Sequence, residues 1–231
     1  MNTDVLLQRE QVEAAFISKV YGWMSAALVI TGVVAMWAAS TPAVLQAIFP
    51  ASGSMLPFYL LIGAEFGAVI FLSARINKMT AETAGIVFLL YSVLNGLTLS
   101  MVFLIYTSSS IASTFLVTAA TFGVMSAYGY MTKKDLTSIG NLAFMALIGL
   151  IIGSVVNIFL QSEIMYWVIT YAGVLIFVAL TAYDTQKIKR MAAYDDTQEV
   201  SKKKSIMGAL TLYLDFVNLF LYLLRFMGDR K

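Results

Sequence analysis

The chain has 231 residues, 60% of them hydrophobic and only 12% charged, with a mean hydropathy of +0.83. Soluble globular proteins carry about 25% charged residues, so the composition argues against a soluble domain and indicates a membrane protein. The formal net charge is +2, and the lysines and arginines are spread over short connections. We therefore expect the lipid bilayer, and not nucleic acid, as the main partner.

The sequence contains no cysteine and no histidine. This excludes disulfides, thiol nucleophiles, haem ligation by histidine and zinc sites built from these residue types. We expect no cofactor, apart from Ca²⁺ as a bound or transported ion. Proton sensing near neutral pH would have to rest on carboxyl groups, because histidine, the usual switch, is missing.

Seven apolar runs predict an all-α membrane protein. A membrane helix needs about 20 mostly apolar residues. Residues 1–15 are polar and have no cleavable signal pattern, so the first run is expected to stay as an anchor. We predict a cytoplasmic tail over 1–19, a single seven-helix domain over 20–226 and a C-terminal tail over 227–231. The predicted spans lie near residues 20–40, 55–74, 83–106, 110–131, 140–160, 164–183 and 206–226.

The connections are short except for 184–205, and Pro57 fits the first turn of the second span. Positive residues lie in the N-terminal tail and in the second, fourth and sixth connections, which predicts a cytoplasmic N-terminus. Seven complete spans would put Arg225, Arg230 and Lys231 outside. A last helix that returns, or crosses only partly, would keep them inside, so the side of the C-terminus stays open.

Two aspartates lie in the last two spans. Asp184 closes the sixth span, and Asp215 lies about ten residues into the seventh, ~15 Å along a helix. No positive residue is within a helical turn of Asp215, and an intramembrane carboxylate is a functional candidate by default. The simpler alternatives are an interfacial position for Asp184 and a structural bond to a neighbouring helix for Asp215.

The two spans are consecutive and enter from the same side, so the carboxyl groups of Asp184 and Asp215 can come level. Two adjacent carboxylates cannot both stay ionised in a medium of low dielectric constant, so the pair would share a proton at low pH. At higher pH both would ionise, repel each other and be able to bind a cation. The sequence thus predicts a pH switch made without histidine.

Oxygen ligands for a hard cation are also present. Glu65 lies within the second span, and it could serve as an ion ligand or be a neutral buried acid. Together with Asp184 and Asp215 it forms the candidate metal set, and Asn95 and Asn218 are candidate members of the ion pathway. No EF-hand spacing is present, so several helices would have to assemble such a site.

Arg75 closes the second span on the side predicted to be cytoplasmic. One interpretation is a long side chain that reaches the interface and sets the topology. The other is a counter-ion for Asp184, which should lie at a similar depth. The pairs Gly63/Gly67 and Gly149/Gly153 have the GxxxG spacing and predict close helix packing.

Four longer stretches carry a family resemblance. They are "GLTLSMVF" in the third span, "MSAYGYMTKKDLTSIGN" after the fourth, "TAYDTQKIK" at the end of the sixth and "LYLDFVNLFLYLLRF" in the last. They resemble the Bax inhibitor-1 family, also called transmembrane BAX inhibitor motif proteins, over almost the whole chain. The short tails resemble the bacterial branch, which implies the inner membrane of a bacterium.

The resemblance implies that six helices surround the last one, and that the protein is a pH-sensitive calcium leak channel or exchanger. It implies a di-aspartyl sensor, whose matching residues are Asp184 and Asp215. It also implies an arginine latch, with Arg75 as the nearest match, and an acidic residue in the ion path, matched by Glu65. Some bacterial members resemble regulators that bind a membrane protease.

Three alternatives remain beside transport. An intramembrane aspartyl protease would use two aspartates, but its GxGD motif is replaced by Leu212-Tyr213-Leu214-Asp215, and we expect no enzymatic activity and no catalytic residue. A retinal protein is disfavoured because no lysine lies within a late span. A regulator that binds a membrane protease or a death-pathway partner, without transport, is the main alternative function.

Overall fold

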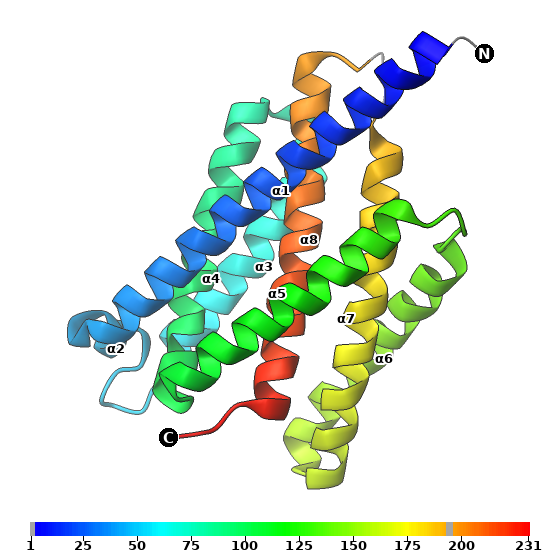
Figure 1. Ribbon diagram of the computed structural model, residues 1–231. Coiled ribbons are helices and arrows are strands. Elements are labelled where there is room, and N and C mark those ends of the chain that lie inside the picture. Colours follow the sequence, from blue (N-terminus) through cyan, green and yellow to red (C-terminus); the bar gives the residue numbers. More distant parts are fainter. Residues whose placement is uncertain (1–2, 193–195) are drawn as a thin grey trace. The chain divides into compact units, whose positions relative to one another are not determined.

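The computed structural model describes residues 3–192 and 196–231, with side chains from residue 11 onward. Within these ranges the chain is helical and contains no strand (Figure 1). The short 3₁₀-helix η1 (Ile76–Lys78) follows α3. The α-helices are α1 (Thr3–Ser40), α2 (Pro42–Ile48), α3 (Leu56–Arg75), α4 (Ala81–Ile105), α5 (Ser108–Met131), α6 (Thr137–Leu160), α7 (Glu163–Met191) and α8 (Gln198–Met227).

Seven helices of the described residues are long and apolar enough to cross a membrane: α1 and α3 to α8. The prediction of seven spans is therefore confirmed. The remaining α-helix, α2, has only 7 residues and is too short to cross. Pro42 and Pro57 lie in the first turns of α2 and α3, where the missing N–H of proline has no helical partner to lose. The first-turn position predicted for Pro57 is confirmed.

Several helices extend beyond the apolar runs that predict them. α1 begins at Thr3, and α7 continues to Met191, so the connection predicted over 184–205 is only the short segment between Met191 and Gln198. The reason is that a hydropathy window ends where charged residues begin, whereas a helix can continue into water. Asp184 consequently lies two helical turns before the end of α7 and is not a helix-end residue.

The chain divides into two compact units, which are described separately because their relative positions are not determined. The first contains residues 1–106, 192–210 and Lys231, and the second contains 107–191 and 211–230. In the first unit α4 packs against α1 and α3. The Thr31 hydroxyl on α1 donates a buried hydrogen bond to the carbonyl of Ser92 on α4, 2.9 Å away. Gly96 lets the helices meet there, because a Cβ would lie 2.8 Å from the Thr31 carbonyl.

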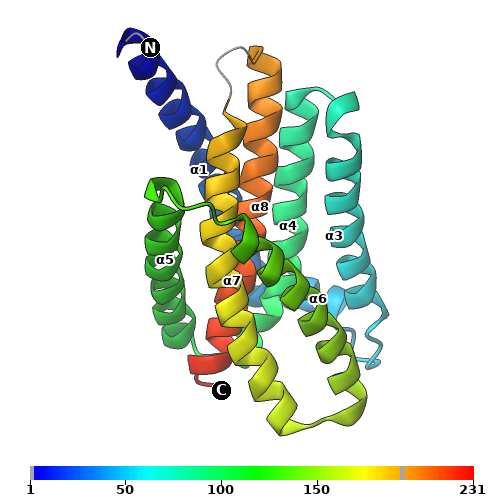
Figure 2. The same ribbon diagram turned by 90° about the vertical axis from the view of Figure 1, so that its right-hand side faces the viewer.

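In the second unit α7 packs against α5 and α6 (Figure 2). Two glycines allow very close contacts with α7: Gly129 on α5 faces the carbonyl of Ala182, and Gly140 on α6 faces the ring of Tyr183. At both positions a Cβ would overlap the facing atoms. Both glycines belong to the motif that follows the fourth span, which gives that motif a packing role.

The GxxxG prediction is wrong for contacts within the described chain. A Cβ at Gly63, Gly67, Gly149 or Gly153 would meet no atom within 4 Å, so these glycines do not bring two described helices together. The spacing rule detects small residues on one helix face, but it cannot tell which face turns toward a neighbouring helix.

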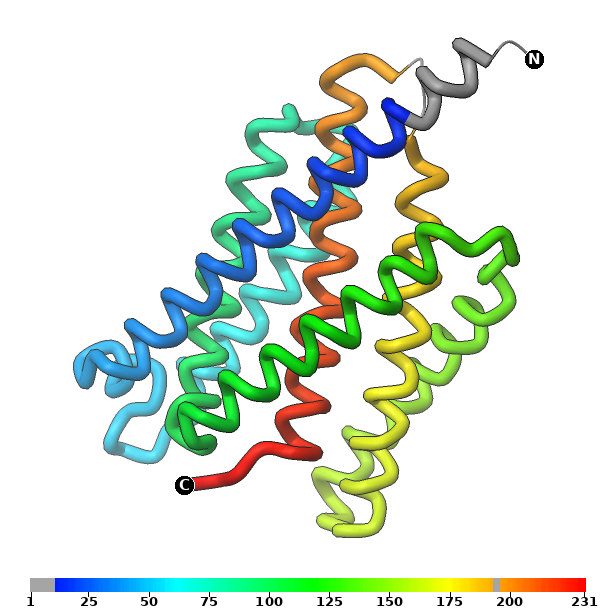
Figure 3. The backbone as a smooth tube through the Cα atoms, in the orientation of Figure 1, coloured from blue at the N-terminus to red at the C-terminus, as the bar shows by residue number. Residues whose placement is uncertain are grey.

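α8 is one uninterrupted helix of 30 residues, ~45 Å long, so it can cross a membrane completely (Figure 3). Of its apolar window 67% is buried, against at most 39% in any other span. That the other six helices surround α8 stays a prediction. The alternative in which the last helix enters and returns is wrong, because no break interrupts α8.

The residues after α8 are fixed at the connection between α4 and α5. The N–H of Lys231 donates to the carbonyl of Ile105 at 2.9 Å, and the Lys231 ammonium donates to that of Phe103 at 2.7 Å. The N–H of Thr107 donates to the carbonyl of Asp229 at 3.0 Å, and the Ser110 hydroxyl donates to the Asp229 carboxylate at 3.2 Å. The C-terminus therefore lies at the same end of the helices as the α4–α5 connection.

The three positive residues of this end are all held by the protein. The Arg225 guanidinium lies 5.3 Å from the ring centres of both Tyr166 and Tyr222, and Arg230 donates to the Tyr166 hydroxyl at 3.0 Å. Lys231 binds the carbonyls just described. These contacts explain how this end of the chain accommodates three positive residues, although the side of the membrane on which they lie stays open.

Candidate functional site

The carboxyl groups of Asp184 on α7 and Asp215 on α8 lie close enough in the second unit to interact directly with each other. Both residues are buried, with exposed fractions of 8% and 5%. A hydrogen bond between two carboxyl groups requires that one of them carries a proton. The predicted juxtaposition of these two residues is therefore present in the structure.

The Oδ2 atom of Asp215 is buried, and no N–H or O–H group of the described residues donates to it. Buried carboxylate oxygens normally accept several hydrogen bonds, and an unsatisfied one costs about 1–3 kcal/mol or more. The aromatic ring of the next residue, Phe216, packs edge-to-face on Phe115 and Phe122 of α5, at 5.5 and 5.4 Å between ring centres. Asp215 thus lies beside an apolar cluster that offers it no donor.

Asp184 has a more polar setting. Lys187, one turn later on α7, acts electrostatically on the Asp184 carboxyl group, and its side chain is exposed. The neighbouring Thr185 is buried and its hydroxyl donates to Ser126 on α5, 3.4 Å away. The pair therefore has an inner member among apolar side chains and an outer member close to a cation.

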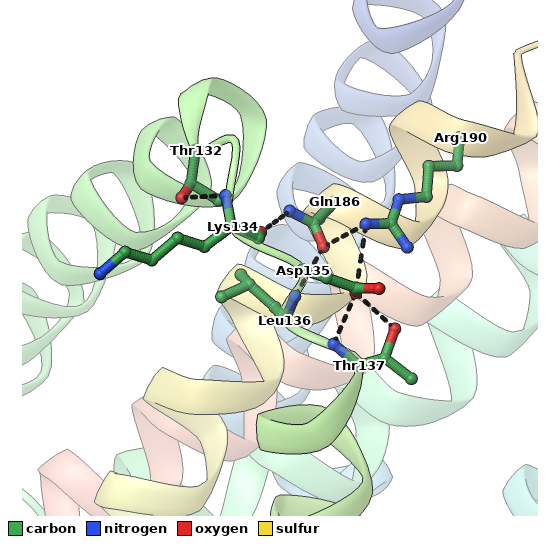
Figure 4. A network of polar contacts seen from close by, with 7 residues as sticks. All are labelled: Thr132, Lys134, Asp135, Leu136, Thr137, Gln186 and Arg190. Carbon is green, nitrogen blue, oxygen red and sulfur yellow. Dashed lines mark hydrogen bonds and ion pairs between the residues drawn. The ribbon is translucent and has the colours of Figure 1, made fainter.

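The chain around Asp184 is held from both sides. Ala182 and Tyr183 contact the glycines of α5 and α6 described above. Gln186, two residues after Asp184, is buried and binds the α5–α6 connection: its Nε2 donates to the carbonyl of Lys134 at 2.8 Å, and its Oε1 accepts from the N–H of Leu136 at 2.9 Å (Figure 4).

Charged residues also bind the α5–α6 connection to α7. The Arg190 guanidinium donates to Gln186 Oε1 at 2.9 Å and to the Asp135 carboxylate at 3.2 Å (Figure 4). Asp135 Oδ1 also accepts from the hydroxyl and the N–H of Thr137, at 2.6 and 3.0 Å. The Thr137 hydrogen bonds and, to a smaller degree, Arg190 hold the pKa of Asp135 below its ordinary value of 3.8.

Sequence reasoning did not identify this clamp, which we define as Gln186, Arg190, Asp135 and the connection they bind. Gln186 and Arg190 are four residues apart, so they share a helix face, and "KKD" in the facing connection offers the complementary groups. That spacing is a signal, but it does not reveal which connection lies opposite.

Glu65 forms a second polar cluster, in the first unit. Thr98 and Asn95 of α4 both donate to its carboxylate, the amide of Asn95 at 3.2 Å. Tyr91, one turn before Asn95, is also buried and interacts electrostatically with Glu65. The structure thus brings together two of the predicted pathway residues, Glu65 and Asn95.

Among the described residues, no hydrogen bond or ion pair joins the remaining candidates to either cluster. Asn218 donates to the carbonyl of Leu214 in its own helix, at 2.8 Å. Arg75 is exposed at the end of α3, and no ion pair of its side chain is found among the described residues. Its role as a latch stays a prediction. Over residues 3–192 and 196–231, no three acidic side chains gather into a group that could hold a metal ion. Glu65 belongs to the first unit and the two aspartates belong to the second, so a joint site of Asp184, Asp215 and Glu65 stays a prediction.

Comparison with known proteins agrees with the resemblance seen in the motifs. The family model described as "Inhibitor of apoptosis-promoting Bax1" matches residues 13–231. The inner membrane protein YbhL of Escherichia coli strain K12 is 50% identical over 231 residues, which cover 99% of this chain and 97% of YbhL. A protein of Borreliella burgdorferi is 45% identical over 222 residues, covering 95% and 94% of the two chains. RP147 of Rickettsia prowazekii is 44% identical over 217 residues, covering 94% and 90%. The chain is therefore a multi-pass membrane protein of the Bax inhibitor-1 family.

Proposed function

We propose that this protein conducts cations, with Ca²⁺ as the expected ion, through a path gated by the Asp184–Asp215 pair. The observation that carries the proposal is the close approach of these two buried carboxyl groups, together with the lack, among the described residues, of any donor to Asp215 Oδ2. In this proposal, a proton shared between the two carboxyl groups gives Asp215 Oδ2 its hydrogen bond. It also holds α7 and α8 together.

Loss of the proton opens the path in this proposal. Two ionised carboxylates at hydrogen-bonding distance repel strongly where water is scarce, so the α7–α8 contact weakens and the carboxylates become ligands for a cation. Flux is low at acidic pH and rises as the pair loses its proton. Since the two groups titrate together, the transition belongs to the pair and not to one residue.

Glu65 is a further candidate ion ligand in this proposal, as the family resemblance implies. It lies ten positions before Arg75 on α3, ~15 Å farther along the helix, and Thr98 and Asn95 keep its carboxylate oriented. We propose no enzymatic activity and no cofactor. We further propose a bacterial inner membrane location, which the name of the relative YbhL gives for that protein, and a cytoplasmic N-terminus, which the charge distribution indicates.

The test is cation flux from proteoliposomes that hold the purified chain, with a Ca²⁺ indicator inside and the external pH varied. We expect Asp184→Asn and Asp215→Asn to flatten the pH response. Glu163→Gln, which neutralises an exposed carboxylate at the start of the same helix α7, should keep it. If both aspartate variants keep wild-type flux and pH response, the gate lies elsewhere. Absence of flux in every variant would favour the regulatory alternative.

A further inference from the structure

The first unit contains a cavity of about 780 Å³ that the proposed function does not use. Helices α1, α4 and α8 line it. This volume is within the range of ~300–1,000 Å³ that small-molecule sites occupy. Its lining includes Lys19 and Trp23 of α1, Gly85 and Ile86 of α4, and Lys202 and Ile206 of α8.

On each of the three helices, a charged lining residue comes one turn before an apolar lining residue. On α1, Lys19 precedes Trp23 by one turn, and on α8, Lys202 precedes Ile206 by one turn. On α4, Glu82 precedes Ile86 in the same way. All three helices enter the membrane from the same side, since one span (α3) lies between α1 and α4 and three (α5 to α7) lie between α4 and α8. The cavity therefore has a charged mouth at the membrane surface and an apolar floor toward the bilayer.

The charged residues at the mouth of the cavity differ in whether they have a partner within the protein. Glu199 accepts from the N–H of Ala81 at 2.6 Å and lies 3.9 Å from the ammonium of Lys203, so partners within the protein already use its carboxylate. No ion pair is formed by Lys19 or Lys202 within the part of the chain that the structure describes. Two ammonium groups are thus available above an apolar floor.

We propose that this cavity binds one anionic glycerophospholipid of the adjoining leaflet, in which no headgroup cation neutralises the phosphodiester. Lys19 and Lys202 hold its phosphodiester, and an acyl chain lies against Trp23 and Ile86. A phosphodiester is singly negative and complements two lysines, while the apolar floor suits hydrocarbon and not a soluble anion. The ring of Trp23 forms one wall, because it lies against Gly85, where a Cβ would be 2.8 Å from the ring.

The experiment uses Trp23 as the reporter. The full chain with Trp37→Phe and Trp167→Phe, both partly exposed positions, is placed in nanodiscs of phosphatidylcholine with increasing brominated phosphatidylglycerol. Bromine quenches tryptophan on contact. We expect quenching to saturate at a low fraction of brominated lipid, because one bound lipid accounts for it. Quenching that rises only in proportion to the lipid fraction, as for bulk lipid, would overturn the proposal.

Charge variants test the role of the mouth. Each lysine near a membrane surface gives about a fivefold gain in affinity for an anionic lipid, so Lys19→Gln with Lys202→Gln should raise the half-saturating fraction by roughly 25-fold. Lys133→Gln with Lys134→Gln makes the same change in net charge outside the cavity and should leave it unchanged. Equal shifts in both double variants would show unspecific attraction and contradict the proposal.

A second lipid tests whether the cavity recognises the phosphodiester, and this test works even if the lysine variant does not fold. Brominated diacylglycerol carries the same acyl chains without the phosphate. Saturable quenching by phosphatidylglycerol, but not by diacylglycerol, supports recognition of the phosphodiester. Equal saturation by both lipids would overturn it, since the cavity would then take any acyl chain. None of these results depends on ion flux, so they are separable from the gating proposal.

Discussion

The backbone of Gly140 on α6 lies directly against the ring of Tyr183 on α7, with no room for a Cβ between them. Tyr183 is the residue before Asp184, so this contact fixes the height and rotation of α7 where the candidate gate lies. A side chain at position 140 must move the ring, the helix or both.

We therefore expect Gly140→Ala to destabilise the protein by about 1–3 kcal/mol, the usual range for an overpacked contact, and to shift the pH response of cation flux. Thermal unfolding in detergent and the flux assay measure the two effects. Gly149→Ala is the matched control on the same helix, because a Cβ there meets nothing within 4 Å, and alanine should be neutral or slightly stabilising. Equal behaviour of the two variants would show that the contact is unimportant.

Gln186→Leu should open the α5–α6 connection. The substitution removes the acceptor of the Leu136 N–H and the donor to the Lys134 carbonyl, and each unsatisfied group costs about 1–3 kcal/mol. Hydrogen exchange should become faster at the Leu136 amide. The amide of Ser162, in the next connection, serves as an internal control, because its N–H donates a hydrogen bond to Asn157 Oδ1 at 2.9 Å that the substitution does not touch. Unchanged exchange at Leu136 would contradict the clamp.

Asp135 gives a pH-dependent contribution to stability with a defined sign. Its pKa lies below 3.8 in the folded chain, so the ionised group stabilises the fold above its unfolded pKa, and this contribution is lost as the pH falls through the folded value. Asp135→Ala should lower Tm at pH 7, and the difference from the wild type should shrink below about pH 3.8. A difference that is the same at pH 3 and pH 7 would show that charge plays no part.

The contacts of the C-terminus make a prediction about topology. Because the chain has no cysteine, Lys231→Cys and Lys134→Cys each introduce a single thiol. We expect a membrane-impermeant thiol reagent to label position 231 in intact cells, and position 134 only after the inner membrane is opened. Labelling of both from the same side would contradict seven complete crossings, and the unmodified chain controls for background.

The sequence was sufficient to predict the number of spans, because a long apolar run can hardly form anything other than a helix that crosses the membrane. It also led to the pairing of Asp215 with Asp184, since an acidic residue without a nearby cation, such as Asp215, is conspicuous in an apolar helix, and Asp184 closes the apolar run before it. It did not distinguish glycines that contact another helix, such as Gly129 and Gly140, from the GxxxG glycines that contact none. That difference depends on which way each helix faces, and nearly uniform hydrophobicity conceals the facing direction.

The clamp escaped prediction for a related reason. Gln186 and Arg190 read as ordinary polar residues after a span, and the windows that locate spans end before them. Only the extension of α7 to Met191 brings them beside the α5–α6 connection. Long-range contacts between charged helix ends and loops leave no periodic pattern in the sequence.

Infrared difference spectroscopy of the purified protein in lipid, between acidic and neutral pH, tests the shared proton most directly. We expect a protonated-carboxyl C=O band at acidic pH that is lost in Asp184→Asn and in Asp215→Asn and is retained in Glu163→Gln. A band that persists unchanged in both aspartate variants would show that the two residues do not hold a proton between them, and would contradict the proposed gate.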